Sequence, residues 1–283
     1  MSTPRNYHIF GHSISQSLSP TIHNAGFAHH GLPHHYDIQE CADLNEVTTM
    51  IDSPDFGGCS ITMPHKLSAS KFCTSISASA RTIGAINTLI ATSENSTKTI
   101  IHGDNTDWSG LHSLITEYTA QTPSPPSSVG LVIGAGGAAR AGVYAMIQAG
   151  VQSIYIGNRT YLKAEAVARD FESRVIPVAF PSRLPESPDL IIGTVPGESM
   201  GAEAFAGLFQ KERGLCIEMS YKPRVTNLLV VAREHRGWVT ADGLEVLLRQ
   251  AFDQFRLWSG REPPQAVMRQ AVMDVTERVQ SKV

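Results

Sequence analysis

Residues 129–140 read VGLVIGAGGAAR and join a short apolar run to a cluster of glycines. Leu131-Val132-Ile133 predicts a strand, and a helix-compatible run follows the glycines at 141–149. In a strand, glycine turn and helix of this kind, backbone N–H groups and the helix N-terminus can hold a pyrophosphate. We therefore predict a dinucleotide site, in which Gly134 permits the tight turn and Gly136 lets the phosphates approach the backbone. The alternative is an ordinary tight turn between a strand and a helix.

The next predicted strand indicates which dinucleotide is bound. The run 153–157 reads SIYIG, and Asn158-Arg159-Thr160 follows it. An NAD site usually has an acid about 20 residues after the glycines, which binds the ribose 2′-hydroxyl. This chain has Arg159 there, with Lys163 one turn later, and a guanidinium suits the dianionic 2′-phosphate of NADP. Solvated charges at a helix start are the alternative, but cations there oppose the helix dipole. We predict NADP rather than NAD.

The composition excludes several other classes of protein. The 283 residues suffice for two modest domains, and 42% hydrophobic with 17% charged residues is typical of globular proteins. A formal net charge of −3 gives no basic footprint for nucleic acid. No apolar run approaches the roughly 18 residues of a membrane span, and the N-terminus lacks an apolar signal core. Four cysteines without CxxC spacing argue against a metal site or a disulfide framework, so we expect a cytoplasmic protein.

Short β-like runs alternate with helical runs along the chain, which predicts mostly parallel α/β sheets. We expect strands at 7–10, 36–38 and 58–62, a hairpin-like pair at 88–91 and 99–101, and helices at 20–30, 43–51 and 66–73. After a Pro- and Ser-rich linker at 118–128 comes a Rossmann-type unit, and two helical runs, 244–257 and 265–279, close the chain. We therefore expect two α/β domains, an N-terminal substrate domain (1–117 with 245–283) and a dinucleotide-binding Rossmann domain (128–244).

Five short polar clusters lie at the edges of these predicted elements. They read SLSP (17–20), TMPHK (62–66), GAINT (84–88), DNTD (104–107) and ADGL (241–244), the last followed by Gln250. Taken singly, each has a purely structural interpretation. Ser19-Pro20 is a good helix start, and Asn87 and Asp107 suit turns and caps.

Taken together, the clusters resemble the signatures of the shikimate dehydrogenase family. The family patterns SxSP, (V/I)TxPxK, GAxNT, NTD, GAGGA and NRT appear in family order as SLSP, ITMPHK, GAINT, NTD, GAGGA and NRT. The C-terminal part, with EMSYKPRVTNLL and ADGLEVLLRQAF, looks most like the shikimate dehydrogenase domain of fungal pentafunctional arom polypeptides and of fungal quinate-pathway relatives. The resemblance extends from Phe10 to about Met273.

The resemblance implies a role for each matching residue. Lys66 and Asp107 would be the catalytic pair. The residues implied to bind the substrate are Ser17, Ser19, Thr62, Asn87, Tyr221 and Gln250. Those implied to bind the cofactor are Gly134, Ala135, Gly136, Gly137, Ala138, Asn158, Arg159, Thr160, Lys163, Thr194, Met219 and Gly243. One departure concerns the nicotinamide side, where an Asn-Ala-Thr-Ser segment of many bacterial members is replaced by GTVP at 193–196.

The implied activity is NADP-dependent interconversion of 3-dehydroshikimate and shikimate. Reduction of a ring ketone leaves an alkoxide that must receive a proton, and a partly buried lysine can supply it. Two alternatives stay open: a quinate dehydrogenase, with NAD as the alternative cofactor, and a non-catalytic ligand sensor related to fungal quinate-pathway repressors. The expected partner is a small molecule, with no nucleic acid and no membrane, and the sequence does not predict an oligomeric state.

Overall fold

The computed structural model describes residues 3–94, 98–122, 128–171, 174–182 and 184–280. The chain divides into two compact units, Met1–Thr106 with Gln250–Val283, and Asp107–Arg249. The predicted domain boundaries at 117 and 245 fall inside two helices, α4 (Asp107–Gln121) and α8 (Gly243–Ser259). The start of the predicted linker is therefore helical as far as Gln121, while residues 123–127 lie outside the described residues.

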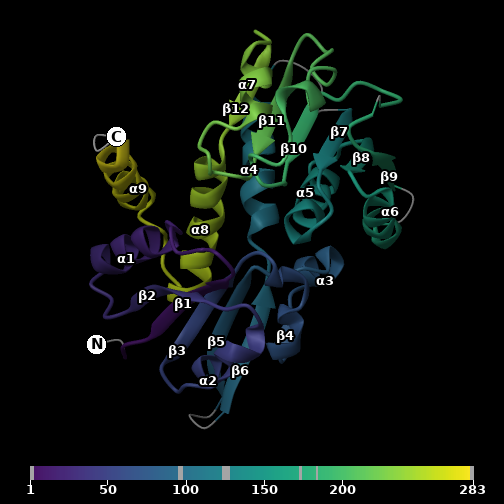
Figure 1. Ribbon diagram of the computed structural model, residues 1–283. Helices are drawn as coiled ribbons and strands as arrows, with labels where there is room; N and C mark the ends of the chain where they lie inside the picture. Colours follow the sequence, from purple (N-terminus) through teal and green to yellow (C-terminus); the bar gives the residue numbers. More distant parts are fainter. Residues whose placement is uncertain (1–2, 95–97, 123–127, 172–173, 183, 281–283) are drawn as a thin grey trace. The chain divides into compact units, whose positions relative to one another are not determined.

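The first unit is built on a six-stranded sheet in the order β2-β1-β3-β5-β6-β4 (Figure 1). Its strands are β1 (Asn6–Gly11), β2 (His35–Glu40), β3 (Phe56–Ile61), β4 (Ser75–Ile76), β5 (Thr88–Glu94) and β6 (Lys98–Asp104). Strands β2, β1 and β3 are parallel, whereas β5 runs antiparallel to both β3 and β6. The hairpin predicted from the runs near 90 and 100 is confirmed.

Helices and short turns of 3₁₀-helix connect these strands. They are α1 (Ser19–His29), η1 (Leu44–Val47), α2 (Thr48–Ile51), η2 (His65–Leu67), η3 (Ala69–Phe72), α3 (Ala78–Ile83) and α9 (Gln265–Gln280). The single helix predicted at 66–73 is wrong, because the structure has two 3₁₀ turns there. The Ser68 hydroxyl donates to the His65 carbonyl at 3.1 Å, which is the local competition that makes serine a poor residue inside a helix.

Both faces of the first sheet are covered. On one face β-strand residues pack with η1, α2 and α3, in a core centred on Phe10, Phe56 and Leu89. A cluster of aromatic rings joins β1, α1 and α8. The ring centroid of Tyr7 lies 5.1 Å from that of Phe27 and 5.2 Å from that of Trp258. Helix α1 packs against α9, and the two lie side by side in Figure 1.

The second unit contains a fully parallel six-stranded sheet in the order β12-β11-β10-β7-β8-β9. Its strands are β7 (Val129–Ile133), β8 (Ser153–Asn158), β9 (Val175–Ala179), β10 (Leu190–Gly193), β11 (Gly214–Glu218) and β12 (Trp238–Ala241). Its other elements are α4, α5 (Gly137–Gln148), α6 (Tyr161–Asp170), η5 (Ala202–Ala204), α7 (Asn227–Arg233) and the first part of α8. This strand order is that of a Rossmann fold, as predicted.

Alternate residues of each central strand pack on opposite faces of this sheet. On β7, Val132 joins the core formed with α4, α5 and α6, whereas Leu131 and Ile133 join the core formed with α7. None of the helices in the described part of the chain combines the length and the apolar character that a membrane crossing requires.

Candidate functional site

The glycine turn lies where the strand order of the second sheet reverses, because β7 has β8 on one side and β10 on the other. Ligands of such sheets bind outside the carboxyl ends of the strands at this point. Gly134 leaves β7 with φ at +124°, a conformation that favours glycine, and its N–H donates to the Gly157 carbonyl at 2.8 Å. The Thr194 hydroxyl, which donates to the Ile133 carbonyl at 2.7 Å, occupies the space that a Cβ at Gly134 would need.

The start of α5 offers its amides without a competing side chain. Gly136 is the N-cap residue of α5, and no side chain caps this helix. A Cβ built at Gly136 would meet no atom within 4 Å, so the space beside the helix start is open. A buried alanine, Ala139, lets the helix approach the sheet. An open approach to uncapped amides fits a bound pyrophosphate.

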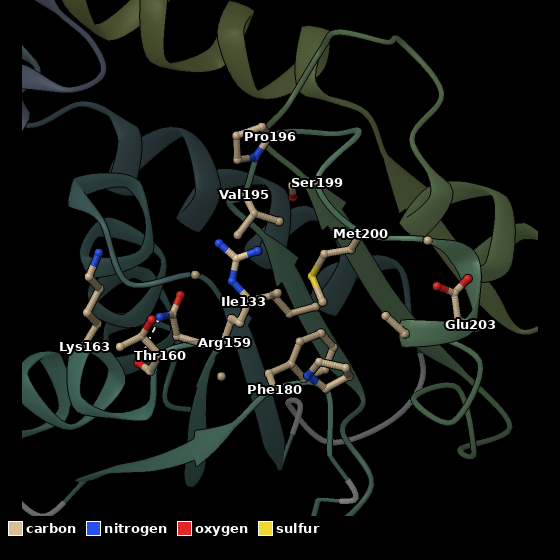
Figure 2. Close-up of a pocket in the computed structure, with 16 residues that line it drawn as sticks. Ile133, Arg159, Thr160, Lys163, Phe180, Val195, Pro196, Ser199, Met200 and Glu203 are labelled. Atoms are coloured by element: carbon tan, nitrogen blue, oxygen red, sulfur yellow. Dashed lines mark hydrogen bonds between the residues drawn. The ribbon is translucent and has the colours of Figure 1, made fainter.

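A cavity of about 410 Å³ opens beside this turn (Figure 2). The residues that line it come from the ends of β7 and β8 and from the segments that follow β7, β8, β9 and β10: Ile133, Gly134, Gly157, Asn158, Arg159, Thr160, Lys163, Phe180, Pro181, Val195, Pro196, Ser199, Met200, Gly201, Glu203 and Ala204. Five of the predicted cofactor residues are therefore gathered around one cavity: Gly134, Asn158, Arg159, Thr160 and Lys163. Sequence reasoning placed the GTVP segment at 193–196 on the nicotinamide side. It missed the lining residues after β9 and those from Ser199 onward, although the carboxyl ends of parallel strands share one edge of the sheet.

Two exposed cations, Arg159 and Lys163, lie along the cavity. Within the described parts of the chain neither forms an ion pair. Figure 2 shows the Arg159 guanidinium between Thr160 and Val195, with Lys163 beyond Thr160 and the acidic Glu203 at the far side. The Asn158 side chain donates to the Thr160 carbonyl at 3.0 Å, which fixes the loop that carries Arg159. The arrangement suits an anion that enters the cavity.

The other predicted cofactor residues do not line this cavity. They are Ala135, Gly136, Gly137, Ala138, Thr194, Met219 and Gly243. The Met219 N–H donates to the Gly193 carbonyl at 2.9 Å, which ties the loop after β11 to the end of β10. A side chain at Gly243 would collide with the backbone of Ser220, so the start of α8 touches that loop directly.

A buried carboxyl, which sequence reasoning also missed, organises the loop after β11. Glu218 is only 2% exposed, and burial raises the pKa of its carboxyl above the ordinary value. The Ser220 N–H donates to Glu218 Oε1 at 2.9 Å, and the Thr226 hydroxyl donates to Oε2 at 3.0 Å; both bonds oppose that rise. Glu218 therefore fixes the loop that carries Met219 and Tyr221.

In the first unit, the two predicted carboxylate-binding serines lie together at the start of α1. Ser19, the first residue of the helix, is buried, and Ser17 precedes it by two residues. The Ser17 hydroxyl donates to Ser19 Oγ at 3.2 Å, and the Ser19 N–H donates to Ser17 Oγ at 3.3 Å. Two hydroxyls beside a helix start can donate together to one carboxylate.

Asn87 and Gln250 are brought together although 163 residues separate them. Asn87 Nδ2 donates to Gln250 Oε1 at 3.3 Å, and both side chains are buried. Thr62 follows β3 directly, and its N–H donates to the Phe10 carbonyl at 2.9 Å, which extends the ladder between β3 and β1 by one residue. Further buried polar residues, Thr88 and Gln254, contact Asn87. Thr88 ends the GAINT motif but has no role predicted from the sequence, and no motif indicates Gln254.

The predicted catalytic residues occupy well-defined places within their own units. Lys66 lies in η2 with a half-buried side chain, and its carbonyl accepts from the Ile86 N–H at 2.8 Å. The neighbouring His65 is buried, and its Nε2 lies 3.0 Å from the Cys41 carbonyl, which holds η2 against the sheet. Asp107 is 4% exposed and begins α4 in the second unit. Tyr221, also in the second unit, lies half-buried after β11.

Three family models match the chain in order. Residues 9–89 match the shikimate dehydrogenase substrate binding domain, residues 122–198 match shikimate/quinate 5-dehydrogenase, and residues 243–273 match the C-terminal domain of shikimate 5′-dehydrogenase. The chain belongs to the shikimate dehydrogenase family. The predicted resemblance and the predicted α/β architecture are thus confirmed.

Two curated proteins are similar to almost the whole of this chain. The pentafunctional AROM polypeptide of Malassezia globosa is 38% identical over 272 residues, which cover 92% of this chain and 17% of that one. The quinate repressor protein of Emericella nidulans is 35% identical over 314 residues, which cover 95% of this chain and 35% of that one. The chain therefore spans between about a sixth and about a third of the length of these relatives.

A solved structure of similar length is shikimate 5-dehydrogenase from Thermus thermophilus, in complex with NADP(H) and shikimate. It superimposes with a TM-score of 0.78 at 28% identity, covering 95% of this chain and 99% of that chain. The shikimate dehydrogenase fold thus extends through both units of this chain.

Proposed function

We propose that this chain is an NADP-dependent shikimate dehydrogenase, which interconverts 3-dehydroshikimate and shikimate. The observation that carries the proposal is the cavity beside the glycine turn, in which Arg159 and Lys163 have no acidic partner among the described residues. A 2′-phosphate would supply the missing anion, whereas the 2′-hydroxyl of NAD would leave both cations unpaired. The similar Thermus enzyme was solved with NADP(H) and shikimate, which supports the same assignment here.

The residues of the second unit fit the cofactor. Gly134 permits the tight turn and Gly136 leaves room for the pyrophosphate, while Asn158, Arg159 and Thr160 would hold the adenosine 2′-phosphate. Met219, on the loop that Glu218 fixes, would contact the nicotinamide side. The bound cofactor would supply or accept the hydride, and the protein supplies position and electrostatics.

The proposed roles of the remaining residues concern the substrate and its proton. Ser17 and Ser19 would donate to the carboxylate, helped by Tyr221, while Thr62, Asn87 and Gln250 would bind ring hydroxyls. Lys66 Nζ would give a proton to the oxygen of the ring carbonyl during reduction and remove it during oxidation. Asp107 would orient that amine and the hydroxyl. A carboxylate beside a lysine raises the lysine pKa, whereas partial burial lowers it.

The decisive assay measures oxidation of shikimate and of quinate, each with NADP and with NAD, by absorbance of the reduced nicotinamide. We expect shikimate with NADP to give the largest kcat/KM of the four combinations. Quinate has an additional hydroxyl at the carbon that carries the carboxylate, where the buried Ser19 would crowd it. A largest kcat/KM for quinate with NAD would instead make the chain a quinate dehydrogenase.

The similarity to a quinate repressor protein favours one other candidate, a ligand sensor without turnover. The presence of both Lys66 and Asp107 argues against it, since a sensor needs no acid–base pair. Calorimetric titration with shikimate, run beside the absorbance assay, separates the two functions. Binding without any reduction of NADP would support the sensor.

A further inference from the structure

A chain of five buried side chains links β2, β3 and β5 of the first unit through α8. The Tyr36 hydroxyl donates to Ser60 Oγ at 2.6 Å, and the Ser60 hydroxyl donates to Gln254 Oε1 at 3.0 Å. Gln254 Nε2 donates to Thr88 Oγ1 at 2.9 Å, and the Thr88 hydroxyl donates to Asn87 Oδ1 at 2.7 Å. The chain therefore ends on a residue that we assign to the substrate.

Backbone groups fix the direction of this chain. Gln254 Nε2 lies 3.3 Å from the Asn87 carbonyl, which can only accept, so the amide nitrogen of Gln254 faces Asn87 and its oxygen faces Ser60. The Thr106 N–H, which can only donate, points to Asn87 Oδ1 at 2.7 Å. Both amides thus have one orientation, and Thr88 must donate to Asn87 rather than accept from it.

The fixed direction determines what Asn87 and Gln250 can offer a ligand. Asn87 Oδ1 already accepts from Thr88 and from the Thr106 N–H. Gln250 Oε1 accepts from Asn87 Nδ2 and from the Thr106 hydroxyl, each at 3.3 Å. Both side-chain oxygens are therefore used within the unit, so the group that each residue would offer a substrate is its amide nitrogen. In this structure Asn87 Nδ2 also donates to Thr106 Oγ1 at 3.0 Å. The acceptor on the substrate would be a ring hydroxyl oxygen.

We infer that Thr88 and Gln254 are positioning residues, which hold the Asn87 amide in the orientation that binds a substrate hydroxyl. The inference rests on the proposed function of this site. Neither residue is assigned to the substrate, because the Thr88 hydroxyl is bonded to Gln254 and Asn87, and the Gln254 amide is bonded to Ser60 and Thr88. Loss of the Thr88 hydroxyl would leave Asn87 Oδ1 short of one donor, so its amide would be held less firmly, although the Thr106 N–H would still donate to it.

The test compares Thr88→Val, which keeps the shape but removes the hydroxyl, with Thr88→Ser, which restores the hydroxyl. We expect Thr88→Val to raise the KM for shikimate about three- to tenfold, the range that one lost hydrogen bond supports. The KM for NADP should stay constant, and Thr88→Ser should return the KM for shikimate close to the parent value. Gln254→Met, which removes the donor to Thr88 from a helix position, should reproduce the effect if Thr88→Val folds poorly.

Thr276→Val provides the matched control in the same unit. Among the described residues, the Thr276 hydroxyl donates only to carbonyls of its own helix, at 3.1 Å from that of Val272 and 2.9 Å from that of Met273. Thr276→Val should at most change the melting temperature, and it should leave the KM for shikimate and the KM for NADP unchanged. A Thr88→Val enzyme with a lower melting temperature but the parent KM for shikimate would overturn the inference and leave Thr88 a structural residue.

A second readout uses shikimate analogues that each lack one ring hydroxyl. The parent should prefer shikimate to the analogue that lacks the hydroxyl bound by Asn87, and Thr88→Val should reduce this preference, which a loss of stability alone would not do. Equal preferences in parent and variant for every analogue would also overturn the inference. A parent protein that neither binds nor oxidises shikimate would instead refute the proposed function, whatever the Thr88 variants do.

Discussion

The Thr194 hydroxyl fills the space beside Gly134 that a side chain at this position would need, at the point where the strand order of the second sheet reverses. Thr194 Oγ1 donates to the Ile133 carbonyl at 2.7 Å, so it is held against the turn by the residue that precedes the glycine. The end of β10 thus closes one side of the glycine turn. Two loops that are 60 residues apart in the sequence thereby form one surface, on which a dinucleotide phosphate can rest.

Two glycine variants separate folding from cofactor binding. Gly134→Ala must place a side chain at φ +124° and against Thr194, so we expect it to destabilise the protein by about 1–3 kcal/mol. Gly136→Ala enters open space at an ordinary backbone angle, and it should cost about 0.5 kcal/mol as a poorer helix cap. The methyl group of Gly136→Ala should nevertheless weaken NADP binding several-fold, because it enters the space proposed for the pyrophosphate. Thermal unfolding and calorimetric titration measure the two effects, and unchanged NADP affinity in Gly136→Ala would contradict the proposed phosphate position.

Arg159→Ala should raise the KM for NADP about tenfold, because it removes a charge-assisted hydrogen bond of roughly 1.5–3 kcal/mol to the 2′-phosphate. The KM for NAD, which has no such phosphate, should hardly change. Arg169→Ala is the matched control: Arg169 is an exposed cation near the C-terminal end of α6, the helix that follows Arg159, and it pairs with Glu165. Steady-state kinetics with both cofactors give the comparison. An equal loss with NADP and NAD would remove Arg159 from the phosphate site.

Lys66→Ala should lower kcat by about 10²–10⁴, the usual range for loss of a positioned acid–base group. Shikimate binding, measured by calorimetry, should weaken far less. Lys71→Ala is the control, because Lys71 lies on the following 3₁₀ turn, where its amine donates to Asn45 and pairs with Asp43. If Lys66→Ala retains a kcat within a few-fold of the parent, Lys66 is not the proton donor.

Those parts of the fold that depend on local sequence could be predicted. The strand, glycine turn and helix around Gly134 follow from apolar runs and from the residues between them, and the hairpin of β5 and β6 follows from two adjacent β-like runs. The helix at 66–73 failed because Ser68 competes for a backbone carbonyl within it. Strand β12 and helix α7, which were not predicted, are short elements near the end of the second unit.

The polar chain in the first unit could not be predicted, because its partners depend on strand order. Ser60 and Thr88 lie opposite each other only because β3 pairs antiparallel with β5. Gln254, which contacts both from α8, lies 166 residues after Thr88 and 194 residues after Ser60. Gln250, four residues earlier on the same face of α8, was found through a family signature rather than through any local signal. Composition and periodicity contain no information on such long-range pairs.

Ser19→Ala should weaken shikimate binding by about 1–2 kcal/mol, since the carboxylate loses one of several donors. Ser19→Gly should also relieve crowding near the carboxylate, so we expect it to narrow the ratio of kcat/KM for shikimate over quinate. Ser17→Ala is the comparison, because it removes a hydroxyl from a more exposed position. A parent enzyme that oxidises quinate faster than shikimate would show that these serines do not determine the selectivity.

His23→Phe should remove part of the acid sensitivity of the fold. His23 is fully buried in α1, with its ring centroid 4.8 Å from those of Tyr36 and Trp258, and burial lowers its pKa to about 3. Neither ring nitrogen makes a hydrogen bond of ordinary geometry with the described residues, and the nearby Gln254 side chain opposes the effect of burial only partly. The unfolded chain gains a proton near pH 6.5, whereas the folded protein does not until near pH 3. The contribution of neutral His23 to the free energy of unfolding is therefore fully present above pH 6.5. It is lost as the pH falls below 6.5, at about 1.4 kcal/mol per pH unit, or about 2 kcal/mol by pH 5.

Urea unfolding between pH 5 and pH 8 measures this effect. The free energy of unfolding should depend less steeply on pH for His23→Phe than for the parent. His35→Gln, at an exposed histidine, should keep the parental slope, and parallel curves for the parent and His23→Phe would show that His23 becomes protonated without unfolding.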